Sequence, residues 1–396
     1  MTVTYITDLL NHHLIPLAQE FFARIGDDFH LIETKDPRVG DYYQKGYAFY
    51  AAKTQADREF PWRVQAYIPS NDALARELAL RSDVVIIGNA SDEWIMPRLR
   101  KHRLTFRAHE RWYRKGLPWY KKPKAMIGGW LHHGRFKSLY LLSASAYTAA
   151  DAFSVGCFRG KAFWWGYFSQ CLPYPQRERE PAVPRILWAG RMIPCKRAGD
   201  ALRACAALLK DGARFTLDLV GSGPEYESLR QLIPELGLDG IASLRGEMPP
   251  EDVRREMQRA DIFVFTSDFQ EGWGSVLNEA MSSGCAVVAS HAAGATPLLV
   301  QSGVNGLVYP SGDIQKLAGC IRFFLENPDK RAEMSAAAYQ TVLTQWSAQE
   351  AAGRFLTLSR ALMQKQPPPH LECGPCAAAA AITNQWITEN GIEEEN

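Results

Sequence analysis

The strongest constraint on the fold is an alternation of apolar runs and helix-like stretches in the second half of the chain. Runs of strand length lie at 185–190, 215–220, 241–246, 261–267 and 285–290. The stretches between them suit helices, and strands that alternate with helices are typical of a parallel, doubly wound sheet. The sequence therefore predicts an α/β, Rossmann-like domain over 185–345, with ligands bound at the carboxyl ends of its strands.

Apolar runs and helix-like stretches also alternate in the first 171 residues, although less regularly. Apolar runs of strand length lie at 2–7, 83–88, 104–108, 138–145 and 162–168, and helix-like stretches lie at 14–25, 93–101 and 146–156. The pattern predicts a second parallel α/β domain over 1–171. A chain of 396 residues also exceeds what one hydrophobic core supports. The stretch 172–184 holds four prolines among charged residues, and we interpret it as the interdomain linker.

The composition narrows the class of protein. Hydrophobic residues make up 46% and charged residues 22%, which is typical of a globular chain rather than a disordered one. No apolar run reaches the roughly 18 residues of a membrane-spanning helix, and the first residues lack the order of a signal peptide. We therefore expect a cytoplasmic protein. The eight cysteines do not have the spacing of a disulfide framework, so we expect reduced thiols.

The C-terminal residues differ in composition from the rest. An amphipathic helix is expected over 346–364, and three prolines follow at 367–369. The acidic end predicts that residues 365–396 form a flexible tail. Cys373 and Cys376 form a CxxC, but no second pair completes a zinc site, so we expect no metal and leave the role of the pair open.

The net charge of +2 hides a strongly basic segment at 98–137. The segment contains thirteen lysines or arginines and a single acidic residue, Glu110, and aromatic residues are interleaved with them. Cations with stacking aromatics also suit single-stranded nucleic acid. No other part of the chain resembles a nucleic-acid module, so we favour an anionic membrane surface as the partner and expect no nucleic acid.

The segment 261–290 carries the most specific chemistry. An apolar run ends in a turn at 270–274, and a helix is expected to begin near Ser275 and to carry Glu279 on its second turn. Gly272 and Gly274 in this turn let a ligand approach the backbone closely. The first N–H groups of the helix favour the binding of a phosphate. Alternatively, the glycines only make a turn and the glutamates are solvated. The candidate binding residues here are Glu271, Gly272, Trp273, Gly274, Ser275, Val276 and Glu279.

Two further loops are expected at the same edge of the sheet. Arg191 and Lys196 follow the run at 185–190, where cations can neutralise a diphosphate. Gly221 and Gly223 follow the run at 215–220 and allow another close approach of the backbone. Each loop alone is weak support, because loop cations are usually only solvated. Their position beside the 270–274 turn makes a nucleotide site the favoured interpretation.

Together these motifs resemble family 4 of the retaining glycosyltransferases from about Arg185 to Trp346. The resemblance rests on the spacing of Glu271 and Glu279, the AGR…K and VGSGPE motifs, and NGLVYPSGD at 305–313. It implies the GT-B fold of two facing Rossmann-like domains, with the final helix crossing back to the first domain. It also implies a nucleotide-diphosphate sugar as donor substrate and no cofactor.

The resemblance implies roles for individual residues. Arg191 and Lys196 would hold the donor diphosphate, Glu279 would bond the ribose, and Glu271 would face the transferred sugar. In the first half the resemblance is weak, because the acceptor-binding domains of the family vary. At the first turn, residues 10–13 replace the glycine-rich loop that is usual in the family. The position of His109 matches a histidine near the transferred sugar, and a structural role is its alternative. His12 and His13 are candidates for the acceptor side.

The expected activity is a metal-independent transfer of a hexose with retention. The catalytic set would be Glu271, His109, Lys196 and Arg191. The acceptor would be a glycan or lipid-linked sugar at the cytoplasmic membrane face, in bacterial cell-surface polysaccharide or lipopolysaccharide synthesis. Two alternatives stay open: a nucleotide-sugar 2-epimerase of the same fold, and a non-catalytic protein that binds sugar nucleotides.

Overall fold

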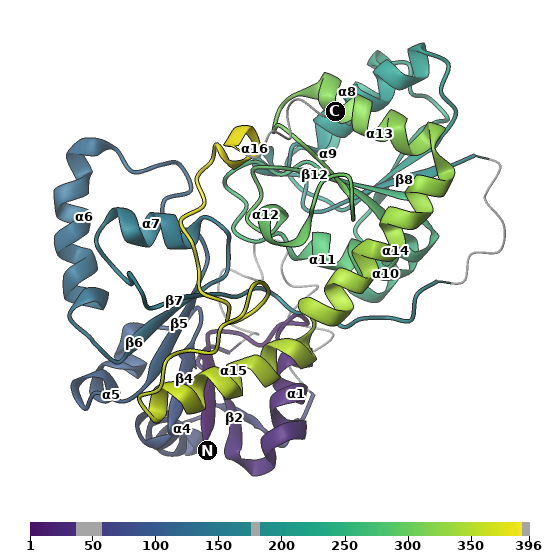
Figure 1. The fold of residues 1–396 in the computed structure, drawn as a ribbon. Helices are drawn as coiled ribbons and strands as arrows, with labels where there is room; N and C mark the ends of the chain where they lie inside the picture. Colours follow the sequence, from purple (N-terminus) through teal and green to yellow (C-terminus); the bar gives the residue numbers. More distant parts are fainter. Residues whose placement is uncertain (37–57, 176–182, 390–396) are drawn as a thin grey trace. The chain divides into compact units, whose positions relative to one another are not determined.

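The computed structural model describes residues 1–36, 58–175 and 183–389. Its contacts divide the chain into two compact units (Figure 1). The first unit combines 1–169 with 346–382, and the second combines 170–345 with the residues from 383 onward. The chain thus passes into the second unit at 169–170, close to the expected boundary at 171–172. Within the expected linker, residues 176–182 lie outside the described ranges.

The first residues of the expected linker belong to the second unit. The Tyr339 hydroxyl donates to the carbonyl oxygen of Leu172 at 2.8 Å. The Tyr174 hydroxyl lies 3.0 Å from the Ser335 hydroxyl, and the Tyr174 and Tyr339 rings meet edge to face with centroids 5.1 Å apart. These contacts attach residues 172–174 to the helix that carries Ser335 and Tyr339.

The first unit is built on a seven-stranded sheet in the order β3-β2-β1-β4-β5-β6-β7. Every neighbouring pair of strands is parallel. Its strands are β1 (Val3–Thr7), β2 (Phe29–Glu33), β3 (Arg63–Gln65), β4 (Val84–Ile87), β5 (Thr105–His109), β6 (Leu139–Ser143) and β7 (Ala162–Trp164). All four residues of β4 are fully buried, as a central strand covered on both faces requires. The sequence did not indicate β2 and β3.

Helices connect and cover this sheet. They are α1 (Ile15–Ile25), α4 (Pro69–Arg81), α5 (Met96–Arg100), α6 (Lys122–Gly129), α7 (Thr148–Ser154) and α15 (Ala348–Met363), with short turns η1 (Gly26–Asp28), η2 (Asp92–Trp94), η3 (Trp119–Lys121) and the π-helix η4 (Trp130–Gly134). Helix α15 packs on α1, where the Phe355 and Phe21 rings lie 5.6 Å apart. The final helix therefore returns to the first unit, as expected. Among the described residues, no helix is both long and apolar enough to cross a membrane.

The second unit is built on a six-stranded parallel sheet in the order β10-β9-β8-β11-β12-β13. Its strands are β8 (Arg185–Ala189), β9 (Thr216–Val220), β10 (Ala242–Gly246), β11 (Ile262–Phe265), β12 (Ala286–Ser290) and β13 (Leu307–Tyr309). Its helices are η5 (Pro194–Lys196), α8 (Ala198–Lys210), α9 (Tyr226–Glu235), α10 (Pro250–Arg259), α11 (Ser275–Met281), α12 (Thr296–Leu299), α13 (Ile314–Glu326), α14 (Pro328–Gln345) and α16 (Trp386–Glu389). The predicted α/β class with two parallel sheets is confirmed.

The prediction of a flexible tail over 365–396 is wrong for the residues that the structure describes. Residues 376–379 pair with edge strand β7 through an antiparallel bridge between Phe163 and Ala378, with Cys376 N donating to Trp164 O at 2.8 Å. Further along, the Trp386 indole is buried in the second unit and donates to the carbonyl oxygen of His291 at 3.2 Å. The free edge of β7 and a large apolar side chain order this segment, and composition alone reveals neither. Residues 390–396 lie outside the described ranges.

Candidate functional site

Three loops at the carboxyl edge of the second sheet bring the predicted residues together. Strand β8 lies between β9 and β11, so the loops that follow these three strands are neighbours. Arg191 and Lys196 lie after β8, the glycines of 221–223 after β9, and Glu271 and Gly274 after β11. Crevices outside the carboxyl ends of parallel strands are where doubly wound sheets bind ligands.

A charged pair forms the centre of this edge. The Lys196 ammonium contacts the Glu271 carboxylate, although the two residues are 75 positions apart in the chain. The Ser267 hydroxyl donates to the same carboxylate at 3.0 Å. The side chains of Lys196 and Glu271 keep 16% and 14% of their surface exposed, so both stay accessible to a ligand. A diphosphate that enters here can take the place of Glu271 as the partner of Lys196.

Buried hydrogen bonds hold the backbone of this pair in place. The Trp188 indole donates to the Thr266 hydroxyl at 2.9 Å, and that hydroxyl donates to the carbonyl oxygen of Lys196 at 2.6 Å. Asp268 N donates to Cys195 O at 2.8 Å. Trp188 and Thr266 are almost fully buried. These positioning residues were missed in the sequence, because Trp188 lies in β8 and Thr266 follows β11, and no local pattern indicates that their polar groups meet.

Gly221 and Gly223 have a structural role. Their φ angles are +139° and +152°, and an added Cβ would lie 1.9 Å from Gly190 O and 2.4 Å from Met192 O, respectively. The loop after β9 therefore lies directly against the loop after β8, where Met192 N donates to Ser222 O at 2.8 Å. The close approach that the sequence indicated is, in this structure, an approach of one backbone to another.

Trp273 cannot contact a donor with its side chain. The indole is fully buried and donates to Asn278 Oδ1 at 2.8 Å, and Ala295 N donates to the Trp273 carbonyl at 3.0 Å. A contact of Trp273 with a donor would therefore involve its backbone, and that contact stays a prediction. Gly274 has a φ of +90°, and a Cβ there would lie 2.3 Å from the Phe265 ring. The Gly-Trp-Gly turn is thus fixed by packing.

Helix α11 carries the second glutamate. It begins at Ser275 and ends at Met281, and Ser275, Val276 and Glu279 are half-buried. Burial lowers the pKa of Arg254, and the nearby Glu279 carboxylate opposes that shift. Arg254 also donates to the Ser282 hydroxyl at 3.0 Å. Glu279 therefore lies near a cation of its own unit. The buried Gly272 belongs to the turn that connects Glu271 to the start of α11.

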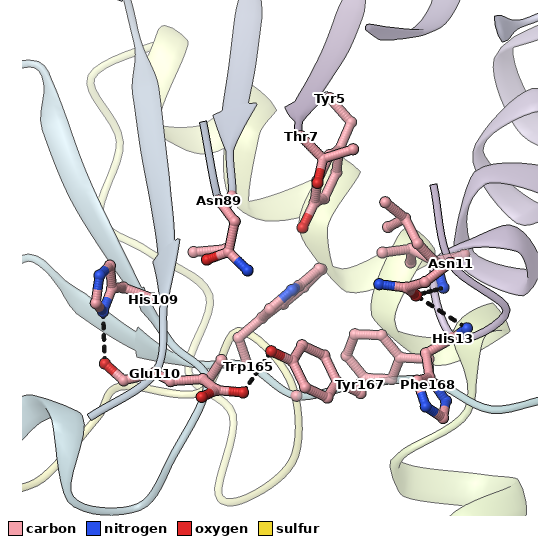
Figure 2. Close-up of a pocket in the computed structure, with 16 residues that line it drawn as sticks. Tyr5, Thr7, Asn11, His13, Asn89, His109, Glu110, Trp165, Tyr167 and Phe168 are labelled. Carbon is pink, nitrogen blue, oxygen red and sulfur yellow. Dashed lines mark hydrogen bonds between the residues drawn. The ribbon is translucent and has the colours of Figure 1, made fainter. Parts of the chain in front are cut away.

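The first unit has a recess at the carboxyl ends of its strands (Figure 2). Residues from the ends of β1, β4, β5 and β7 line it, among them Thr7, Asn89, His109, Trp165 and Tyr167. His13 also lines it, and its ring is stacked on Tyr167 with centroids 6.0 Å apart. The ring of His12 lies 3.7 Å from that of His13. The three predicted histidines of this unit therefore lie in or beside one recess.

His109 is held as a neutral ring. Its Nδ1 lies 2.6 Å from the carbonyl oxygen of Glu110, so Nδ1 carries the proton and Nε2 keeps its lone pair. Burial lowers the pKa of His109, and the positive charges of Arg107 and Arg114 lower it further, against the opposing hydrogen bond to Glu110. His109 can therefore accept a hydrogen bond from a substrate hydroxyl at neutral pH.

Glu110 and Tyr167 were missed as functional candidates. The Tyr167 hydroxyl donates to Glu110 Oε1 at 2.5 Å, and Arg114 contacts Oε2. Burial, followed by the charge of Glu110, raises the pKa of Tyr167 well above its usual value, so the phenol stays protonated. The position of Glu110 as the only acid in the basic segment was the available signal.

Known proteins match the second half of the chain most clearly. Residues 175–341 match the model of the family described as glycosyl transferases group 1. A relative from Erwinia amylovora, the amylovoran biosynthesis glycosyltransferase AmsK, is 34% identical over 142 residues, or 35% of each chain. A GDP-mannose-dependent alpha-(1-6)-phosphatidylinositol monomannoside mannosyltransferase from Mycobacterium tuberculosis is 28% identical over 43% of this chain and 46% of its own. The chain spans less than half the length of these two curated relatives.

Solved structures match nearly the whole fold. HepE from Anabaena, solved in complex with UDP, has a TM-score of 0.65 at 16% identity and covers 92% of this chain and 99% of its own. Sucrose-phosphate synthase from Thermosynechococcus elongatus has a TM-score of 0.65 at 15% identity, with coverage of 92% and 100%. At such identities the likeness concerns the fold alone, and the fold is the expected GT-B. Residues 175–341 of this chain are thus similar to the glycosyl transferases group 1 family, and family 4 stays a prediction.

Proposed function

We propose that the chain is a retaining, metal-independent glycosyltransferase that moves a hexose from a nucleotide-diphosphate sugar to a glycan or lipid-linked acceptor. The observation that carries the proposal is the Lys196–Glu271 pair at the carboxyl edge of the second sheet. It lies inside the family match, and relatives named for amylovoran and mannoside synthesis support cell-surface glycan synthesis as the setting. The structure of HepE with UDP supports a nucleotide sugar as donor.

In the proposed mechanism, positive charge stabilises the leaving diphosphate. Lys196 and Arg191 would bind the diphosphate, and the charge that develops as the anomeric bond breaks would fall between them. Glu271, released from Lys196, would accept hydrogen bonds from the sugar hydroxyls, and Glu279 would bond the ribose. His109 Nε2 would accept from a hydroxyl of the transferred sugar. The acceptor hydroxyl would attack on the face that the diphosphate leaves, and a phosphate oxygen would take its proton.

The test is a product analysis with a defined donor. A thermal-shift panel of nucleotide sugars identifies the donor, and NMR of the product gives the anomeric configuration. Lys196→Ala and Glu271→Ala are expected to lower kcat/KM by at least about 100-fold, because each removes an interaction made in the transition state. The exposed residues Lys210 and Glu235 give the matched controls Lys210→Ala and Glu235→Ala, which should keep full activity.

Four outcomes would each contradict part of the proposal. A product with inverted anomeric configuration would contradict a retaining mechanism. Full activity of both variants would contradict the assignment of Lys196 and Glu271 to the active site. A change in the sugar nucleotide without any acceptor would indicate the 2-epimerase instead. Activity that survives treatment with EDTA is expected, and its loss with recovery on adding Mg²⁺ would contradict metal independence.

We further propose that the exposed surface of 114–131 docks on an anionic membrane face from the cytoplasm. Arg98, Arg107 and Arg111 of the basic segment are buried and have structural partners: Arg98 donates to Ala79 O at 2.8 Å, Arg107 contacts Asp92, and Arg111 lies 3.5 Å from Asp151. The side chains of 114–131 are more exposed than these arginines, and helix α6 within this stretch has no buried residue. The exposed apolar side chains of 114–131 are Trp119, Tyr120, Met126, Ile127, Trp130 and Leu131.

The chemistry of this surface fits lipid headgroups. Trp119 is 84% exposed and Trp130 is 59% exposed, which is costly in water and favourable at a membrane interface. Lys121, Lys122 and Lys124 are exposed between these aromatic residues, and each can contribute about 1 kcal/mol near an anionic surface. A lipid-linked acceptor would be met at such a surface.

Vesicle flotation tests the membrane proposal. The protein should float with vesicles of phosphatidylglycerol and phosphatidylcholine, and 0.5 M NaCl should release it. Changing Lys121, Lys122 and Lys124 to glutamate should weaken binding by at least about 100-fold, whereas Lys210→Glu should change it little. Equal binding to pure phosphatidylcholine vesicles, or unchanged binding of the triple variant, would overturn the proposal.

A further inference from the structure

The last described residues, 383–389, belong to the second unit and end in helix α16 (Figure 1). Trp386 and Ile387 are buried, with 7% and 3% of their surface exposed. The Trp386 indole donates to the carbonyl oxygen of His291 at 3.2 Å. His291 follows strand β12, so the segment is attached at the carboxyl edge of the second sheet, where the proposed donor groups also lie.

His291 connects the loops that follow three neighbouring strands, β11, β12 and β13. Its backbone N–H donates to Tyr309 O at 3.0 Å, and its ring Nδ1 accepts from Ser311 N at 2.9 Å. Its ring also meets the Phe269 ring edge to face, with centroids 5.1 Å apart. His291 is buried, with 8% of its surface exposed, so packing on several sides holds its ring.

The loop that contains Phe269 also carries Glu271. Glu271 N donates to Asp268 O at 3.0 Å, and Asp268 N donates to a carbonyl oxygen of η5 at 2.8 Å. Phe269 lies between the partners of the first hydrogen bond, and its ring contacts His291. A series of contacts therefore leads from Trp386 through His291 and Phe269 to the backbone of Glu271.

We propose that Trp386 is a positioning residue of the donor site, which acts through His291 and Phe269 on the loop that carries Glu271. The inference rests on the proposed glycosyltransferase function. A loop that is ordered before a ligand arrives loses less conformational entropy on binding. If the ordered loop becomes a minor state, the apparent dissociation constant rises in inverse proportion to its population. The C-terminal segment therefore raises the affinity for the donor by ordering this loop.

Binding of a nucleoside diphosphate tests the proposal. UDP, GDP, ADP and dTDP are titrated into the full chain by isothermal titration calorimetry, and the tightest of them is used for the variants. Trp386→Ala should raise its dissociation constant by at least about tenfold, because the ordered loop should fall to about a tenth of the population or less. Gln385→Ala, at an exposed position of the same segment, should bind like the parent.

Trp386→Phe is the conservative variant. It keeps an aromatic ring but removes the hydrogen bond to His291 O, so a rise of the dissociation constant by about threefold is expected. Thermal unfolding checks that each variant is folded. Trp386→Phe also keeps the test decisive if Trp386→Ala does not fold, and parental binding of Trp386→Phe would then overturn the inference.

Two readouts separate positioning from a general loss of stability. Amide exchange of 266–271, followed by mass spectrometry without ligand, should be faster in Trp386→Ala, whereas exchange of 162–164 should not change, because those residues pair with 376–379. With an active donor, the variant should have a higher donor KM and a kcat within about twofold of the parent, since saturating donor restores the ordered loop. A merely structural role would lower kcat through the folded fraction and leave the dissociation constant of the folded protein unchanged.

A double-mutant cycle tests the path through the rings. Phe269→Leu removes the ring that meets His291 and should also weaken the nucleoside diphosphate, by at least about threefold. If Trp386 acts through this ring, the double variant should bind within about twofold of Trp386→Ala, because the loop has already been released.

The outcomes separate this inference from the proposed function. Parental binding, or parental exchange of 266–271, in Trp386→Ala would overturn the inference, and so would effects that multiply in the double variant. The titration and the amide exchange need no sugar transfer. Variants that behave as described in a chain that transfers no sugar would contradict only the proposed function, whereas sugar transfer by a chain whose variants bind and exchange like the parent would contradict only the inference.

Discussion

Lys196 and Glu271 illustrate what single residues contribute to this chain. Each lies on a different loop, and the buried Trp188–Thr266 hydrogen bond fixes the backbone of one of them. A lysine that already faces a carboxylate is oriented before a diphosphate arrives, so less ordering is required on binding. The sequence indicated both residues by their loops but not their contact, because the contact depends on how two loops meet.

Gly221 shows the strictest requirement for one residue type. Gly221→Ala should lower the free energy of unfolding by at least about 3 kcal/mol, because the new Cβ would lie 1.9 Å from Gly190 O in backbone that cannot easily move. Gly212→Ala is the matched control. Gly212 also has a positive φ, of +86°, but a Cβ there meets nothing within 4 Å, so the cost should be only about 1 kcal/mol. Urea unfolding measures both, and equal losses would contradict the prediction.

His133 should make the first unit sensitive to acid. Burial lowers the pKa of His133 to about 4, with help from Arg107, while Asp92 opposes the shift. The unfolded chain binds this proton near pH 6.5, so the stabilisation is fully present above that pH and is lost as the pH falls toward 4. The loss is at most about 3 kcal/mol.

His133→Phe tests this effect, since the ring packs between Trp112 and Phe158, with centroids 5.2 and 5.5 Å away. The variant should lose less stability than the parent between pH 7 and pH 4.5 in urea unfolding. His370→Gln, at an exposed position, should retain the parental pH dependence. A parental pH dependence in His133→Phe would show that this histidine is not responsible.

At the scale of elements, the residues after α15 act as an extra strand. Ala379 N donates to Ala162 O at 2.9 Å, and Trp164 N donates to Ala377 O at 2.8 Å. This pairing covers the edge of β7, which would otherwise be open to another chain. The sequence suggested a tail here because the segment differs in composition from the rest of the chain and ends in acidic residues. Pairing with an edge strand needs backbone groups only, so composition does not reveal it.

Ala379→Pro should remove this pairing. Proline cannot donate the hydrogen bond to Ala162 O, so a loss of about 1–3 kcal/mol is expected, with faster amide exchange at 162–164. Ala380→Pro changes the next, exposed residue and should have a smaller effect. Hydrogen exchange followed by mass spectrometry measures both variants. Unchanged protection of 162–164 in Ala379→Pro would contradict the assignment of an extra strand.

At the scale of the whole molecule, the chain consists of two units, each with its own parallel sheet. The proposed donor groups lie in the second unit and the recess in the first, so ligands should stabilise the units separately. A donor nucleotide at 100 times its dissociation constant should raise the stability of the unit that binds it by about 2.7 kcal/mol. Without an acceptor, core amides of β9 and β12 should exchange more slowly, and those of β2 and β4 should not.

Native-state hydrogen exchange with the nucleoside diphosphate of the best donor measures this difference. Lys196→Ala should abolish the protection of β9 and β12. Protection of β2 and β4 alone would place the nucleotide in the first unit and contradict the assignment of the donor site.

The amino-acid sequence alone indicated the parallel α/β class, five of the six strands of the second unit, and the loops that carry Arg191, Lys196 and Glu271, whereas β13 was not predicted. These features depend on local periodicity and on turn residues, which are encoded over a few neighbouring positions. The folded structure was needed to show the Lys196–Glu271 contact, the burial of Trp273, the recess around Glu110 and Tyr167, and the strand formed by residues 376–379. Each of these depends on groups far apart in the chain, and their meeting depends on packing and edge pairing rather than on any local pattern.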